Sequence, residues 1–143
     1  MRTIDQFNFK NKKAIIRVDF NVPIDNNKVT DTSRIKASKQ TIDKVCNDGG
    51  SCVLVSHLGR PKGFQKQFSM TKIINEVENV LDRNVVLSKD VIGPDAKKKS
   101  LDLKPNQVLL LENVRFHDEE KKGDIDQQYL LYHQLHNHLI VEF

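Results

Sequence analysis

Four short apolar segments, separated by stretches with helical periodicity, constrain the fold of this chain more than any other feature of its sequence. The segments span residues 13–19, 51–56, 84–87 and 107–111. All four are far shorter than the ~20 apolar residues of a membrane span, so they are read as strands. The first is nearly continuous in apolar character, with Ile15, Ile16 and Val18, which is typical of a strand that is covered on both faces.

Helical patterns fill the intervals between these predicted strands. A first helix is predicted from about Ser33 to Gly49, a second from Ser69 or Thr71, and a shorter third over 95–101. The first has a polar start, an apolar stripe and a glycine pair at its end. This alternation predicts an α/β fold: a parallel sheet with helices on both faces, in a Rossmann-like three-layer arrangement.

Charge is unevenly distributed along the chain. The 143 residues contain 23 Lys and Arg and 19 Asp and Glu, a formal charge of +4. Residues 124–143 contain no Lys or Arg and three acidic residues, so residues 1–123 carry a charge of +7. A charge of this size suits an anionic small ligand or a weak contact with nucleic acid, and it does not choose between them.

Several classes of protein are disfavoured by the composition. The amino terminus lacks the apolar core of a signal peptide and no segment is long enough to span a membrane, so we expect a cytoplasmic protein without membrane contact. The only cysteines, Cys46 and Cys52, lack metal-ligand spacing and are predicted to be reduced thiols. His133, His136 and His138 have no matched acidic or cysteine partner, and no metal site is predicted.

Polar and charged side chains follow three of the predicted strands. Because ligands of open parallel sheets bind at the carboxyl ends of the strands, these residues are the candidate site. A single arginine in such a loop is ordinarily a surface salt-bridge partner, whereas arginines at several matching strand ends indicate a site for a small polyanion. The nearby Asp and Asn would read a hydroxyl of that ligand. The candidates are Asp19, Asn21, Arg34, His57, Leu58, Gly59, Arg60 and Arg115.

Nucleotide-binding signatures are absent from the sequence. It contains neither G-x-x-x-x-G-K-[ST] nor a G-x-G-x-x-G that follows a strand. A nucleotide site, if the function needs one, is therefore not visible in this sequence.

Four segments resemble the signature segments of the phosphoglycerate kinase family. They are Arg17-Val-Asp-Phe-Asn-Val-Pro23, Arg34-Ile-Lys-Ala-Ser38, Ser56-His-Leu-Gly-Arg-Pro-Lys-Gly63 and Leu110-Leu-Glu-Asn-Val-Arg-Phe116. They occur in the order of the family and at compatible spacing. The resemblance covers residues 1 to about 123, most of the amino-terminal domain of that two-domain family.

The resemblance implies a reversible phosphoryl transfer between 1,3-bisphosphoglycerate and ADP, which gives 3-phosphoglycerate and ATP in glycolysis. It implies that Asp19 and Asn21 contact the glycerate, and that the 3-phosphate is held by His57, Arg60 and Arg115. Arg34 would reach the transferring group as the catalytic residue. The family is typically monomeric, and its Mg-ADP or Mg-ATP binds to a carboxyl-terminal domain that this sequence does not contain.

Residues 124–143 are predicted to form a divergent tail outside the family pattern. The Gly-Thr-x-His-Arg segment of the family is missing, which suggests a frameshift or a truncation. We expect an unpaired edge on the incomplete sheet, partly covered by a helical stripe of Leu130, Leu135, Leu139 and Ile140. The chain by itself is predicted to be inactive as a kinase.

Two further hypotheses remain beside a kinase family member. The chain could be a non-catalytic phosphoglycerate-binding module, or a basic α/β interaction domain that touches nucleic acid without sequence specificity.

Overall fold

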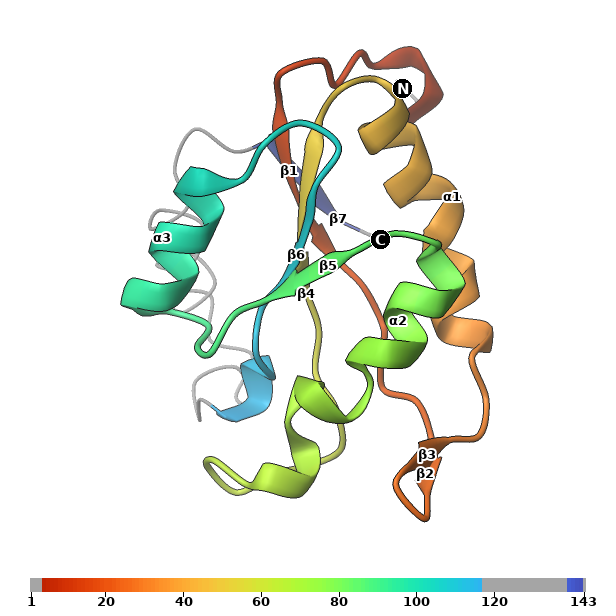
Figure 1. Ribbon diagram of the computed structural model, residues 1–143, viewed down its shortest axis with the longest axis vertical. Coiled ribbons are helices and arrows are strands. Elements are labelled where there is room, and N and C mark those ends of the chain that lie inside the picture. The colour runs from red at the N-terminus through yellow and green to blue at the C-terminus, as the bar shows by residue number, and fades with distance from the viewer. Residues whose placement is uncertain (1–3, 117–138, 143) are drawn as a thin grey trace.

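A five-stranded parallel sheet forms the centre of the computed structural model, which describes residues 4–116 and 139–142 (Figure 1). The strands lie in the order β5-β6-β4-β1-β7. Their bounds are Lys13–Arg17 (β1), Ser51–Val55 (β4), Val85–Leu87 (β5), Val108–Leu110 (β6) and Leu139–Glu142 (β7). The parallel α/β fold predicted from the alternating pattern is confirmed.

Helices cover both faces of the sheet. Helices α1 (Ser33–Asn47) and α2 (Ile74–Leu81) pack on one face, and α3 (Pro94–Asp102) lies on the other (Figure 1). Within these ranges and the rest of the described chain, no helix has the length and apolar character needed to cross a membrane.

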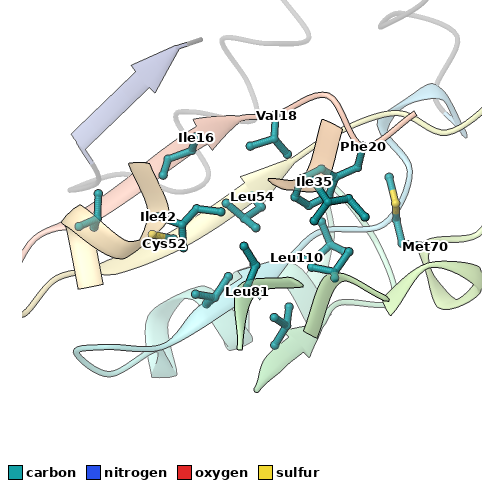
Figure 2. Packing of buried hydrophobic residues seen from close by; sticks show 14 of the residues in the cluster. Ile16, Val18, Phe20, Ile35, Ile42, Cys52, Leu54, Met70, Leu81 and Leu110 are labelled. Atoms are coloured by element: carbon teal, nitrogen blue, oxygen red, sulfur yellow. The ribbon is translucent and has the colours of Figure 1, made fainter. Parts of the chain in front are cut away.

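The register of the sheet explains how the two cores form. Ile16, Leu54 and Leu110 are register partners across β1, β4 and β6 and point into the core beneath α1 and α2 (Figure 2). Their neighbours Ile15, Val53 and Leu109 are also partners and belong to the core on the α3 side. Strands buried on both faces need apolar residues at every position, which is why the sequence shows continuous apolar runs.

Three details differ from the sequence-based expectation. The loop after β1 contains a small antiparallel hairpin of β2 (Ile24–Asp25) and β3 (Lys28–Val29), which turns through the left-handed residues Asn26 and Asn27. Ser69 accepts a hydrogen bond from the Thr71 amide, but it begins a 3₁₀ turn over Met70–Lys72, and α2 begins only at Ile74. The prediction for the start of the second helix was therefore several residues early.

The third difference concerns the edge of the sheet at β1. Leu139 and Ile140 were predicted to lie on a helical stripe, but they belong to β7, which pairs with β1 in parallel. The prediction of a helix here was wrong, because 139–141 is a run of Leu, Ile and Val that satisfies backbone groups of β1 as a strand. Leu130 and Leu135 lie outside the described residues, and the proposed boundary at residue 123 stays a prediction.

Candidate functional site

The candidate residues lie on loops that leave three neighbouring strands. Because β1, β4 and β6 are adjacent and parallel, their carboxyl ends meet at one edge of the sheet. Asp19 and Asn21 follow β1, the segment 57–60 follows β4, and Arg115 follows β6. The sheet topology thus brings together loops that are up to about a hundred residues apart in the sequence.

Arg34 is held against the loop after β1. Its Nη1 donates to the backbone carbonyl of Asn21 at 2.7 Å and lies 3.3 Å from the Asp19 carboxylate. The side chains of Arg34 and Asp19 are 52% and 59% exposed. Since exposed ion pairs contribute little stability, the Asp19 pair does not prevent Arg34 from turning to an anionic ligand.

Asn21 connects this loop to the next one. The Gly59 amide donates to the Asn21 side-chain oxygen at 2.8 Å. Gly59 adopts a left-handed conformation with φ of +63°, and a Cβ there would lie 2.4 Å from ring carbons of Phe68. Only glycine combines this conformation with this close approach, so the residue shapes the turn that carries Arg60.

Arg115 binds the opposite side of the same turn. Its Nη1 donates to the Gly59 carbonyl at 3.2 Å, while its backbone amide donates to the Asn113 side chain at 3.0 Å. A continuous chain of hydrogen bonds therefore runs from Arg34 through Asn21 and Gly59 to Arg115. We call the residues Asp19, Asn21, Arg34, Gly59, Arg60 and Arg115 the basic rim.

The remaining predicted residues have different environments. Arg60 is exposed on the loop after β4, and His57 is half-buried at the base of that loop. The side chain of Leu58 is 2% exposed and belongs to the core beneath α1 and α2. Leu58 therefore offers its backbone to the rim, and its carbonyl accepts a hydrogen bond from Asn113.

Two clefts open beside the basic rim. A cleft of about 300 Å³ between β1 and α1 is lined by Asp19 and Arg34 among others. A second, of about 390 Å³, lies between the β2–β3 hairpin and the loop after β4, and its lining includes Asn21 and Gly59. Arg60 and Arg115 line neither of these two clefts.

Sequence reasoning missed the buried polar residues that support the rim. Ser56, Ser69, Glu112 and Asn113 are all at most 7% exposed, and Ser56 Oγ accepts a hydrogen bond from the Phe20 amide at 2.9 Å. The available signal was their position: each stands beside a buried apolar residue near a strand or helix end.

Residues 133–138, which contain three histidines, lie outside the described part of the chain. Within the described part, no cluster of three or more His, Cys, Asp or Glu is arranged to hold a metal ion.

Comparison of the sequence with models of known protein families shows to which family the chain belongs. The family model described as phosphoglycerate kinase matches residues 4–140. The chain belongs to the phosphoglycerate kinase family. A phosphoglycerate kinase of Porphyromonas gingivalis is 52% identical over 120 residues, which cover 83% of this chain and 29% of that protein. One of Moorella thermoacetica is 42% identical over 123 residues, 85% of this chain and 31% of that protein.

Solved structures of the phosphoglycerate kinase family have the same fold. The crystal structure of the Pyrococcus horikoshii enzyme matches with a TM-score of 0.85 and 29% identity, over 99% of this chain and 36% of that chain. The Coxiella burnetii enzyme matches with a TM-score of 0.65 and 33% identity, over 78% and 27% of the two chains. The chain spans about a third of the length of the curated relatives that it matches.

Proposed function

We propose that this chain supplies the phosphoglycerate-binding half of a phosphoglycerate kinase. In the complete enzyme, the phosphoryl group on the carboxyl of 1,3-bisphosphoglycerate passes to ADP and leaves 3-phosphoglycerate and ATP. The observation that supports the proposal is the basic rim, where arginines from three different segments surround the loops at one sheet edge. Family membership supports the identity of the ligand.

The proposed roles follow from the chemistry of each side chain. Arg60 and Arg115, with His57, hold the 3-phosphate, because guanidinium groups match phosphate with paired N–H donors and stay charged at any working pH. Asp19 and Asn21 read the glycerate hydroxyl, since a carboxylate would be repelled by the anionic ends of the ligand. The backbone of Leu58 and Gly59 borders the ligand at the turn.

Arg34 is the proposed catalytic residue. Phosphoryl transfer needs positive charge on the equatorial oxygens of the transferring group, and an arginine in this role contributes about 10³–10⁵ in rate. In a complete enzyme that carries this segment, Arg34→Ala is expected to lower kcat far more than it raises KM. A change confined to KM would contradict the assignment.

Family membership implies the use of a magnesium-bound nucleotide in general, but the described residues do not fit one. The chain has no P-loop sequence, and its described part has no cluster of acidic or histidine ligands for a metal. The 143-residue chain by itself is expected to bind phosphoglycerate without turnover in a coupled ADP/ATP assay, and measurable turnover would contradict this. A monomeric state and a cytoplasmic location remain predictions.

The proposal is tested by thermal unfolding of the 143-residue chain with 3-phosphoglycerate. A ligand that binds only the folded state raises the Tm with concentration. We expect a saturable rise with 3-phosphoglycerate that exceeds the rise with inorganic phosphate at equal ionic strength. No rise, together with salt-sensitive binding to DNA, would favour the nonspecific interaction domain instead. Complementation with a nucleotide-binding chain tests the other hypothesis. Restored kinase turnover would favour a part of a kinase, and binding without turnover would favour a separate phosphoglycerate-binding module.

A further inference from the structure

A buried asparagine behind the basic rim joins both ends of the loop that carries Arg60. Asn113 has no exposed surface. Its Nδ2 donates to the Leu58 carbonyl at 2.7 Å and to the Phe68 carbonyl at 2.9 Å. These two carbonyls mark the ends of residues 58–68, which we call the Arg60 loop. One amide group therefore fixes how wide this loop opens.

The same side chain fixes the start of the Arg115 segment. The Arg115 amide donates to Asn113 Oδ1 at 3.0 Å, and the Arg115 side chain then reaches the Gly59 carbonyl at 3.2 Å. The amide thus uses its donor group on the Arg60 loop and its acceptor on Arg115. No other proteinogenic side chain of this size presents a donor pair and an acceptor in this geometry.

Glu112 anchors the chain just beyond the Arg60 loop. It is 7% exposed, and its Oε2 accepts a hydrogen bond from the Ser69 hydroxyl at 2.7 Å. Its Oε1 accepts from the Met70 amide at 2.7 Å and from the Asn113 amide at 2.8 Å. A buried carboxylate surrounded by three donors is compensated for its lost hydration, so it holds Ser69 and Met70 firmly.

We propose that Asn113 is a positioning residue that sets the distance between Arg60 and Arg115, with Glu112 as its anchor. This inference rests on the proposed function, because the two arginines are taken to share one phosphate. Two guanidinium groups bind one phosphate well only when their separation matches it. A misplacement of about 1 Å of groups that position a substrate can cost on the order of 10²-fold in activity.

A purely structural role for Asn113 gives a different expectation. Removing a buried amide leaves carbonyls without partners and lowers the stability of the fold whatever the ligand does. The test therefore compares Asn113→Ala with Val53→Ala in the 143-residue chain. Val53 is fully buried in the core on the α3 side, in β4 and away from the Arg60 loop, so its truncation lowers stability without touching the rim.

Two measurements are made on each folded variant at a temperature below both transitions. The first is the dissociation constant for 3-phosphoglycerate, and the second is hydrogen exchange of the backbone amides without ligand. For Asn113→Ala we expect a loss of affinity of at least about tenfold, in line with the cost of misplaced binding groups, and faster exchange within the Arg60 loop. For Val53→Ala we expect unchanged affinity and unchanged exchange in that loop.

Each outcome decides the proposal. Wild-type affinity in folded Asn113→Ala, or an equal loss in both variants, would overturn it. If Asn113→Ala does not fold, Ser69→Ala takes its place. It removes the hydroxyl bond to Glu112, together with the two bonds that this hydroxyl accepts from Thr71, and leaves Asn113 intact. A partial loss of affinity would then support the proposal, and wild-type affinity would overturn it. If the wild-type chain does not bind 3-phosphoglycerate, the proposed function fails. Hydrogen exchange still tests the positioning role separately, because unchanged exchange of the Arg60 loop in Asn113→Ala would overturn it.

Discussion

The Gly59 amide donates a hydrogen bond to the side-chain oxygen of Asn21 at 2.8 Å, which ties the loop after β4 to the loop after β1. Arg34 binds the backbone carbonyl of the same asparagine, and Arg115 binds the carbonyl of the same glycine. Two of the three rim arginines are therefore placed by one pair of neighbouring residues. The consequence is that a change at Gly59 or Asn21 disturbs arginines that are distant from each other in sequence.

The Gly59 turn gives a first prediction with a matched control. Gly59→Ala is expected to weaken 3-phosphoglycerate binding and to lower the free energy of unfolding, because its Cβ would lie 2.4 Å from Phe68 ring carbons. Gly63 also has a positive φ, of +69°, but a Cβ there meets no atom within 4 Å. Gly63→Ala should therefore lower the free energy of unfolding only by the cost of placing a residue with a side chain in the left-handed conformation, about 1–2 kcal/mol.

Chemical denaturation and calorimetric titration of both glycine variants check this prediction. The larger loss of stability and the loss of affinity should be confined to Gly59→Ala. Equal effects in both variants would show that the contact with Phe68 does not shape the turn.

Arg115 gives a second prediction. Arg115→Ala is expected to weaken 3-phosphoglycerate binding by about 1.5–3 kcal/mol, the usual contribution of a hydrogen bond to a charged group. Arg115→Lys keeps the charge but loses the planar pair of donors, so it should restore only part of the affinity. Lys97→Ala on the exposed surface of α3 removes the same charge far from the rim and serves as the control. Equal affinity losses in Lys97→Ala and Arg115→Ala would mean that net charge, and not the rim, binds the ligand.

Much of the fold follows from local sequence pattern. The apolar runs predict β1, β4, β5 and β6 to within two residues at each end. For β1, β4 and β6 this follows because a strand covered on both faces has apolar residues at successive positions. The hairpin at Ile24–Val29 was missed, since its strands are two residues long and polar in part. Strand β7 was missed because the short apolar run at 139–141 fits a helical stripe as well as a strand, and only the long-range pairing with β1 decides between the two.

The candidate site was predicted less completely than the fold. The parallel topology predicts that Asp19, Arg60 and Arg115 share an edge, since strand-end loops of such sheets converge. It does not predict which loop backbone each arginine binds. The roles of Glu112 and Asn113 escaped prediction because hydrogen bonds to Ser69 or Leu58 link residues more than forty positions apart. Such partners are defined only by the packed structure.

The two cysteines give a third prediction, on the dependence of stability on pH. A hydrogen bond with Cys46, together with burial, raises the pKa of the Cys52 thiol. A group whose pKa is raised in the folded state contributes stability below its unfolded pKa, about 8.5 for cysteine, and this stability is lost as the pH rises above that value. The contribution of Cys52 to the free energy of unfolding should therefore fall as the pH rises from 8.5 to 10, a range that begins at that unfolded value of about 8.5.

Urea denaturation across this pH window checks the role of Cys52. Cys52→Ala should make the decline with pH shallower, even though the variant is less stable at neutral pH. In the native wild-type chain, Cys52 should also resist alkylation, because the thiolate is the nucleophile. A decline of the same slope in Cys52→Ala, or rapid alkylation of native Cys52, would contradict the prediction.

The most direct test of the account is to map where 3-phosphoglycerate binds on the isotope-labelled 143-residue chain by NMR chemical-shift perturbation. We predict saturable shifts at the carboxyl ends of β1, β4 and β6, centred on Asn21, Gly59 and Arg115. The amides of Lys97, Lys98 and Lys99 on α3 should stay unshifted. Shifts concentrated on that lysine run, or no saturable shifts at the basic rim, would contradict the claim that this sheet edge is a phosphoglycerate site.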